Sequence, residues 1–404
     1  MEILSKASLA AGIAASVAKS TISYYVRGPK CASWPLWFQI KHDAIHSVVK
    51  KSAHRVVTDD EIDSIDFAEI AADNRKYDLP VSEIPPSMGS FERGIIDVSA
   101  VPIDTQAFAG TGPAEKELVS LTETDLSKSS SERRQIAFDI IVPTTLIVTA
   151  PSAFECKPLN SNEHIILYLH GGGYALGSAA SHRGLTGRLA FQSSLRCVAI
   201  DYRLAPLHPY PAQLHDAFIA LQYLVQQGFQ PENIVLAGDS AGGNLVLALT
   251  MLLRHIGVPQ LRGLVLFSPW PDLVSQRPSI RQNDKFDYLA AIPHESPLCQ
   301  SRLFYAPGRP YSQELIAEMA HPLVSPINGD FKDFPPTLIQ VGDKEMLFDD
   351  ISELHHNMLA ANPDRHGSFI YECYADMLHV FHQFLDLPAA QEAFISAGKF
   401  TKGL

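Results

Sequence analysis

Residues 234–253 read IVLAGDSAGGNLVLALTMLL, and this stretch decides the fold. An apolar run of strand length ends at Gly238, and a run with the length of a helix begins after Gly242. Between them, the pattern GDSAG predicts a sharp strand-to-helix turn that lifts the hydroxyl of Ser240 above the edge of a sheet. The flanking glycines leave room where a side chain would collide with neighbouring chain, and the following helix directs its positive end at this point. Ser240 is therefore the candidate nucleophile.

Short apolar runs alternate with helical stretches around this motif. The helical stretches include 212–227 and 244–255, and the apolar runs are 136–148, 165–169, 197–200, 234–237, 264–267, 337–341 and 369–371. Apolar strands separated by helices predict an α/β fold with a largely parallel sheet covered on both faces. We place this domain at 131–404, after an N-terminal segment at 1–130 that lacks the strand–helix rhythm.

The composition is that of a globular protein with an acidic balance. The length of 404 residues exceeds the usual single-core size of about 250–300, which predicts one large domain with additions or two domains. Hydrophobic residues at 46% and charged residues at 19% exclude a disordered chain. A net charge of −12 argues against a nucleic-acid partner. The five cysteines are scattered without a CxxC pair, which disfavours a zinc site or a disulfide scaffold.

A second glycine-rich motif, HGGGY at 170–174, follows the apolar run at 165–169. Three glycines allow backbone N–H groups to face a tetrahedral oxyanion without obstruction by a Cβ atom, and each such donor contributes about 3–4 kcal/mol to a transition state. We predict Gly172 and Gly173 as donors, with the N–H of Ala241 as the third. A phosphate-binding loop is a weaker interpretation, because no GK[ST] follows and the GxGxxG spacing does not fit.

The sequence resembles the hormone-sensitive-lipase-like family of α/β-hydrolases, and a GP–SWP stretch at 28–35 is similar to that of its fungal-type members. The resemblance rests on motifs in the family's order: HGGGYALGS at 170–178, DYRLAP at 201–206, HPYPAQLHD at 208–216, GDSAGGNL at 238–245 and SPWPDL at 268–273. It implies an α/β-hydrolase fold, with a mostly parallel central sheet flanked by helices and a helical cap. It also implies an esterase or lipase-like serine hydrolase with an acyl-enzyme intermediate and no metal or organic cofactor.

The resemblance also implies a serine, an acid and a histidine in that chain order. His379, in ADMLHVFHQF, is the predicted base, and His382 is its rival. Aligning Leu-Phe-Asp at 347–349 with the Leu-x-Asp segment of the family predicts Glu345 as the acid. Asp343 is the second candidate and Asp349 a supporting residue; three other aspartates are expected to brace loops, Asp201, Asp216 and Asp239.

In this family a cap built from N-terminal helices and an insertion covers the serine, and here the insertion spans about 274–327. Its aromatic residues either line a site for a bulky apolar group or dock the cap to the body. Tyr174 and Trp270 are candidate substrate-binding residues. The expected substrate is a small apolar ester or lactone, and the oligomeric state stays open.

The N-terminus contains the apolar run LAAGIAASVA at 9–18, flanked by Lys6 and Lys19. The run is shorter than the ~20 residues of a transmembrane helix. A helix that packs on the body or rests weakly on a membrane surface is the favoured interpretation, with a signal peptide or an anchor as alternatives. We therefore expect a cytoplasmic or membrane-associated protein, at the endoplasmic reticulum, ahead of a secreted one.

Two alternatives to an esterase stay open at this point. Receptors related to the family keep the serine and lack the histidine, so the retained His379 argues for an enzyme. The same nucleophile and oxyanion loop also serve lactone-opening or cyclising hydrolases of fungal secondary metabolism, and the motifs do not separate these reactions.

Overall fold

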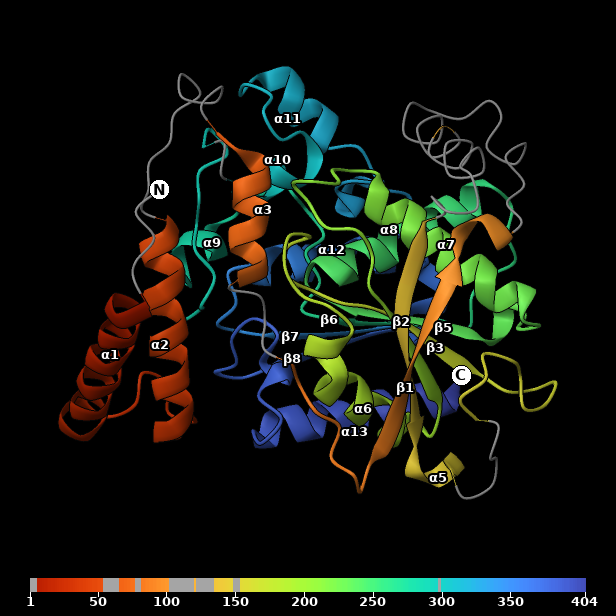
Figure 1. Ribbon diagram of the computed structural model, residues 1–404, viewed down its shortest axis with the longest axis horizontal. Helices are drawn as coiled ribbons and strands as arrows, with labels where there is room; N and C mark the ends of the chain where they lie inside the picture. Colours follow the sequence, from red (N-terminus) through yellow and green to blue (C-terminus); the bar gives the residue numbers. More distant parts are fainter. Residues whose placement is uncertain are drawn as a thin grey trace.

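An eight-stranded sheet forms the centre of the computed structural model, which describes residues 6–53, 65–76, 81–101, 120, 134–147, 153–296 and 299–404 (Figure 1). The strand order is β1-β2-β4-β3-β5-β6-β7-β8. The β1–β2 and β2–β4 pairs are antiparallel, and the other pairs are parallel, so the predicted mostly parallel α/β sheet is confirmed. The strands are β1 (Gly89–Asp97), β2 (Gln135–Pro143), β3 (Ile165–Leu169), β4 (Arg196–Ile200), β5 (Ile234–Asp239), β6 (Gly263–Phe267), β7 (Thr337–Gly342) and β8 (Phe369–Tyr374).

Helices cover both faces of this sheet (Figure 1). Alternate side chains of β3 belong to two separate cores: Ile166 and Tyr168 to one, Leu167 and Leu169 to the other. This alternation follows from the two-residue period of a strand, and burial on both faces explains why the strands read as continuous apolar runs. The helices of the first face are α6 (Arg183–Ser193) and α13 (Pro388–Gly403); those of the second are α7 (Ala212–Gln226), α8 (Ala241–His255) and α12 (Phe348–Ala361).

The sheet begins N-terminal to the boundary predicted at residue 131. Strand β1 pairs with β2 along its whole length, from Gly89 opposite Pro143 to Asp97 opposite Gln135. Its sequence GSFERGIID lacks a clear apolar alternation because it is an edge strand with an exposed Ile95. The α/β body therefore includes part of the segment that the sequence assigned to the N-terminal region.

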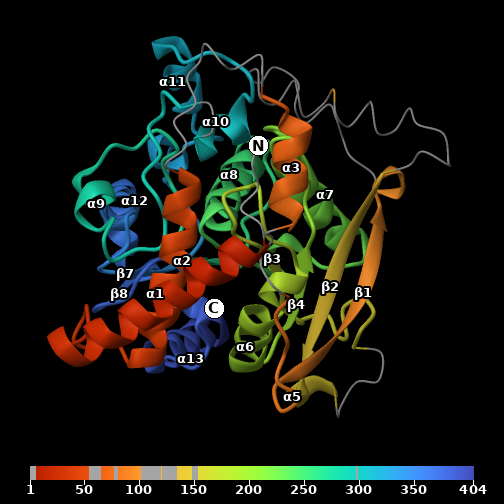
Figure 2. The ribbon, with the colours of Figure 1, turned by 60° about the vertical axis from the view of Figure 1, so that its left-hand side comes forward.

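The cap region contains short helices above the carboxyl ends of the strands (Figures 1 and 2). The predicted insertion at 274–327 holds α9 (Pro278–Gln282), α10 (Gln300–Tyr305) and α11 (Gln313–Met319). The N-terminal segment supplies α1 (Lys6–Arg27), α2 (Leu36–Ala53) and α3 (Phe67–Lys76), while α5 (Thr144–Ile147) follows β2. Residues 102–119 and 121–133 lie outside the described part of the chain.

The apolar run at 9–18 lies within α1, which packs beside α2 at one side of the molecule (Figure 2). Across the described residues, no helix combines the length and the apolar character that crossing a membrane requires.

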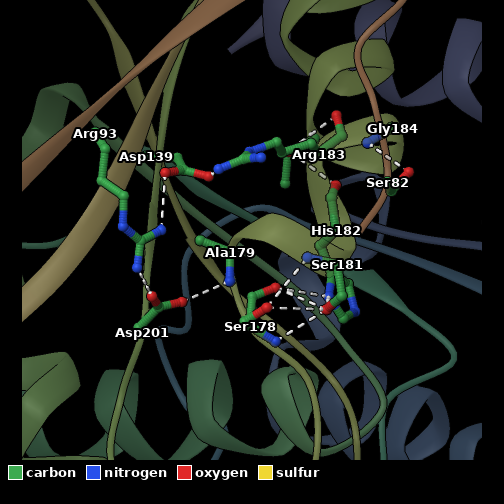
Figure 3. A network of polar contacts seen from close by, with 11 residues as sticks. Ser82, Arg93, Asp139, Ser178, Ala179, Ser181, His182, Arg183, Gly184 and Asp201 are labelled. Atoms are coloured by element: carbon green, nitrogen blue, oxygen red, sulfur yellow. Dashed lines mark hydrogen bonds and ion pairs between the residues drawn. The ribbon is translucent and has the colours of Figure 1, made fainter. Parts of the chain in front are cut away.

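A polar network ties β1 and β2 to the glycine-rich loop that follows β3 (Figure 3). Arg93 donates to Asp139 Oδ1 at 3.0 Å and also contacts Asp201, while Arg183 Nε donates to Asp139 Oδ2 at 2.7 Å. Asp201 Oδ1 accepts a hydrogen bond of 2.7 Å from the backbone N–H of Ala179. Asp201 therefore braces a loop, in agreement with the sequence expectation.

Candidate active site

The serine turn has the strained backbone that its sequence predicts. Ser240 stands between β5 and α8 with φ 52° and ψ −120°, values that few residues with a side chain adopt. A Cβ atom on Gly242 would lie 2.0 Å from Leu169 O, so only glycine permits this approach. Backbone bonds secure the turn, because Ser240 N donates to Phe267 O at 3.0 Å and Trp270 N donates to Ser240 O at 2.9 Å. The hydroxyl is thus held on a rigid support.

Three residues predicted from the sequence meet at this turn. His379 Nε2 lies 2.8 Å from Ser240 Oγ, and His379 Nδ1 lies 3.1 Å from Glu345 Oε2. His379 and Glu345 are both buried, whereas Ser240 is partly exposed. A hydroxyl next to an imidazole that a carboxylate orients is the arrangement that activates a serine nucleophile.

A second hydroxyl holds the carboxylate of Glu345. Glu345 Oε1 accepts hydrogen bonds of 2.6 Å from both Ser268 Oγ and Gly342 N. Ser268 Oγ in turn accepts a bond of 3.1 Å from Val380 N, next to the histidine. Ser268 therefore joins the acid loop to the histidine loop. Ser268 was not predicted as a site residue, and its place in the motif SPWPDL was the available signal.

The charges around His379 favour its protonated form. Burial lowers the pKa of His379, but the hydrogen bond and charge of Glu345, with the charge of Asp287, reverse this effect and raise the pKa above 6.5. Burial also raises the pKa of Glu345, and its bond to His379 opposes that rise. Asp287 comes from the cap, is buried, and accepts a 2.7 Å bond from Met346 N. Asp287 was not predicted, because no motif surrounds it in the sequence.

This electrostatic arrangement predicts the acidic limb of the pH profile. His379 must be neutral to accept a proton, so activity is lost as pH falls through its pKa. Because that pKa is raised, we expect the limb of kcat/KM to have its midpoint above pH 6.5. Initial rates with p-nitrophenyl acetate across pH 5–9 measure it. A midpoint below the ordinary histidine pKa of about 6.5 would contradict the assigned charge environment.

The rival histidine lies in a different environment. His382 is buried among aromatic side chains, with its ring centroid 4.4 Å from that of Phe267, and its Nε2 is 3.1 Å from Gln340 Oε1. Burial lowers the pKa of His382 to about 3, which keeps the ring neutral. His382 is thus a core residue, and His379 is the histidine that contacts the serine.

The other candidate acids bond elsewhere. Asp343 Oδ1 accepts a hydrogen bond of 2.6 Å from Asp376 N, and Asp343 is not the carboxylate that contacts His379. Asp349 Oδ2 accepts one of 2.8 Å from Ser279 N, so it supports the junction of the cap with α12. Asp216 binds the Arg203 backbone N–H at 2.9 Å and its guanidinium, the bracing role that was expected of it.

The glycine-rich loop has the compact form that an oxyanion site needs. Gly172, Gly173 and Tyr174 have successive positive φ values of 112°, 59° and 65°. Asp239 Oδ1 accepts a 2.9 Å bond from Gly171 N, and a Cβ atom on Gly171 would lie 2.2 Å from Asp239 Oδ2. Asp239 is therefore structural, as expected. The donor roles of Gly172, Gly173 and the N–H of Ala241 stay predictions.

Tyr174 anchors this loop, and its contact with substrate stays a prediction. Its side chain is 1% exposed, stacks on Phe304 with ring centroids 3.9 Å apart, and donates to Asn244 Oδ1 at 2.5 Å. The positive φ turns this side chain into the core, which the sequence pattern does not reveal. Trp270 is partly exposed and packs against the same core, and its contact with substrate stays a prediction.

A cap glutamine reaches the same loop. Gln300, at the start of α10, donates from Nε2 to Gly173 O at 2.7 Å. A Cβ atom on Gly173 would lie 2.9 Å from the Gln300 side chain, so the amide covers the loop closely. Gln300 acts on the site through the loop and is a positioning residue that the sequence analysis missed.

Removing this amide is expected to loosen the oxyanion loop. Gln300→Ala should lower kcat about tenfold with little change in KM, because a displaced N–H donor weakens transition-state binding more than substrate binding. Gln313→Ala, which changes an exposed glutamine of the neighbouring helix α11, is the matched control. Steady-state kinetics with p-nitrophenyl acetate test the pair. Equal kcat values for both variants would contradict the positioning role of Gln300.

The chain belongs to the α/β-hydrolase family. The sequence model of the family described as alpha/beta hydrolase fold matches residues 166–383, which include the serine turn and the histidine. Among characterised relatives, the chain is 34% identical to an acetyl-hydrolase of Streptomyces hygroscopicus, over 69% of this chain and 90% of that protein. It is also 34% identical to an esterase of Acinetobacter venetianus, over 62% of this chain and 78% of that protein.

Solved structures support the hormone-sensitive-lipase-like resemblance. An esterase from the bacterial hormone-sensitive lipase family has a TM-score of 0.60 and 25% identity, covering 90% of this chain and 97% of that one. A mutant of the esterase E40 has a TM-score of 0.61 and 26% identity, covering 89% of this chain and 96% of that one. A serine triad and an oxyanion hole are typical of this family. The two named relatives are bacterial, so the fungal-type affinity stays a prediction.

Proposed function

We propose that this carboxylic ester hydrolase works through an acyl-enzyme on Ser240. The observation that supports the proposal is the line of contacts from Ser240 Oγ to His379 Nε2 and from His379 Nδ1 to Glu345. As Oγ attacks the ester carbonyl, its proton passes to Nε2 and the imidazolium is stabilised by the carboxylate. The proton then goes to the leaving alcohol, and water repeats the sequence to release the acid.

The oxyanion formed in each half-reaction needs donors close to Ser240. We assign this role to the N–H groups of Gly172, Gly173 and Ala241. Ala241 is the first residue of α8, where the helix dipole favours negative charge. The scheme uses only side chains, backbone groups and water.

Small apolar esters are the proposed substrate class. The names of the relatives, acetyl-hydrolase and esterase, support a short acyl group. A lactone fits the same chemistry, since its ring opening leaves the acyl group on Ser240 with the alcohol still attached. Rates with p-nitrophenyl esters whose acyl chains have two to twelve carbons measure the acyl-chain preference.

A fluorophosphonate probe tests the nucleophile directly. The wild type should be labelled and Ser240→Ala should not, because the probe reacts with an activated serine oxygen. Wild-type turnover of p-nitrophenyl acetate should accompany labelling. A wild-type chain that is folded but neither labelled nor active would instead support the receptor interpretation.

A role in fungal secondary metabolism is proposed on the fungal-type resemblance of residues 28–35 alone. Comparing the metabolites of a wild-type strain with those of a Ser240→Ala strain tests it. An accumulated acylated compound or lactone would identify the natural substrate, and unchanged metabolites would contradict the pathway role.

A further inference from the structure

Helix α1 has an apolar face that points away from the protein. Exposed fractions are 64% for Ile22, 75% for Tyr25 and 75% for Val26, and the exposed residues Ala15 and Ala18 precede them on the chain. The spacing 15, 18, 22, 25 and 26 places these side chains along a single stripe of a helix with 3.6 residues per turn. The apolar stripe therefore faces outward.

The opposite face of α1 meets α2 and carries serine hydroxyls. Ser16 Oγ donates to Asp43 O at 3.0 Å, and Ser20 is 2% exposed. A surface helix of a globular protein normally turns its apolar stripe to the core and its hydroxyls to water. In α1 large apolar side chains are exposed while serine hydroxyls face α2, which indicates an apolar partner for the outer face.

The N-terminal segment that contains α1 is basic. The first 55 residues contain eight lysines and arginines and two acidic residues, although the whole chain has a net charge of −12. Lys19 and Arg27 are exposed on α1 itself. On α2, Lys41 Nζ lies 5.1 Å from the centroid of the Trp37 ring, and tryptophan with lysine is typical of helices at a membrane interface.

We propose that α1 docks flat on an anionic lipid bilayer, with Ile22, Tyr25 and Val26 in the boundary between headgroups and acyl chains. Lys19, which borders the stripe, then contacts lipid phosphates. A second copy of the chain suits this face less well, because it would bring a segment of the same positive charge against it. The sign of the charge thus favours anionic lipid.

Helix α2, which packs beside α1, contacts the chain on either side of His379. Trp34 Nε1, just before α2, donates to Asp376 O at 2.5 Å, and Phe38 meets Phe384 with ring centroids 4.8 Å apart. These contacts flank the loop that carries His379. A pocket of about 560 Å³ lies between the same region and the cap, lined by Lys30, His46, Asp284, Lys285 and Phe286. The helix pair α1 and α2 is therefore attached to the part of the body that holds His379.

Vesicle co-sedimentation of the full chain tests the docking. We expect binding to vesicles of phosphatidylcholine with 30% phosphatidylserine to exceed binding to phosphatidylcholine alone by about tenfold, and to weaken in 0.5 M NaCl because salt screens the charges. The double variant Ile22→Glu/Val26→Glu should lose binding about tenfold or more. Ile395→Glu, which adds one charge at a residue 43% exposed on α13, should bind like the wild type.

Measurements of hydrolysis, of vesicle binding by a Ser240→Ala variant and of oligomeric state separate the outcomes. Hydrolysis of soluble p-nitrophenyl acetate should be unchanged in the double variant, which shows that it is folded. Ser240→Ala should bind vesicles like the wild type, so docking is tested independently of the proposed catalysis. Equal vesicle binding by wild type and double variant would overturn the proposal. So would a wild-type dimer in light scattering that the double variant abolishes, since a second copy would then cover the stripe.

Discussion

His379→Ala is expected to lower kcat/KM for p-nitrophenyl acetate by about 10⁵- to 10⁶-fold. The imidazole is 2.8 Å from Ser240 Oγ and is the group placed to take its proton. Without the imidazole no base removes the proton of the hydroxyl, whose own pKa is high. Water must then supply the proton to the leaving alcohol. A residual rate of about 10³- to 10⁴-fold over the uncatalysed reaction should remain, because the proposed oxyanion donors and substrate binding are left intact.

His382→Gln is the control for this variant. It changes a second buried histidine three residues away, whose pKa of about 3 keeps it out of proton transfer. A glutamine can still hydrogen-bond Gln340, so we expect kcat/KM to stay within about tenfold of the wild type and the melting temperature to fall by a few degrees. Comparable losses in the two variants, with both folded, would contradict the assignment of His379 as the base.

The serine turn was predictable because its determinants are contiguous in the sequence. Strand, turn and helix occupy 234–253, and the turn needs glycines at fixed offsets from Ser240. The parallel strands were predictable for a related reason, since burial on both faces requires continuous apolar runs. Strand β1 was missed because an edge strand with exposed residues carries no such run.

The residues that support the site were less accessible to sequence reasoning. Ser268, Asp287 and Gln300 contact partners 77, 59 and 127 residues away along the chain. Each contact depends on where the cap and the strand ends come to lie, and no local period or spacing encodes that position. The direction of the Tyr174 side chain is likewise set by the folded loop.

Glu345→Gln is expected to lower kcat/KM by about 10³- to 10⁴-fold. Glu345 Oε1 accepts from both Ser268 Oγ and Gly342 N, so the amide oxygen of the glutamine must take that side. Its NH₂ group then faces Nδ1 of His379, where the wild type has a carboxylate oxygen 3.1 Å away. An amide donor at Nδ1 selects the tautomer whose proton is on Nε2, and that tautomer cannot accept the proton of Ser240.

The same substitution should move the pH profile. The bond and charge of Glu345 raise the pKa of His379, so their loss lets burial dominate and shifts the acidic limb of the residual activity to lower pH. Glu345→Asp keeps the charge with a shorter reach, and we expect a loss of about 10- to 100-fold with the limb retained.

Asp343→Asn is the matched test of the alternative acid. Its carboxylate accepts from Asp376 N and not from His379, so activity should stay within about threefold of the wild type. Steady-state kinetics from pH 5 to 9 on these variants separate the two carboxylates. If Asp343→Asn lost activity as Glu345→Gln is expected to, and Glu345→Gln kept it, the acid would lie two residues earlier. The loop from β7 to α12 would then have to rearrange during turnover to bring that shorter side chain to the imidazole.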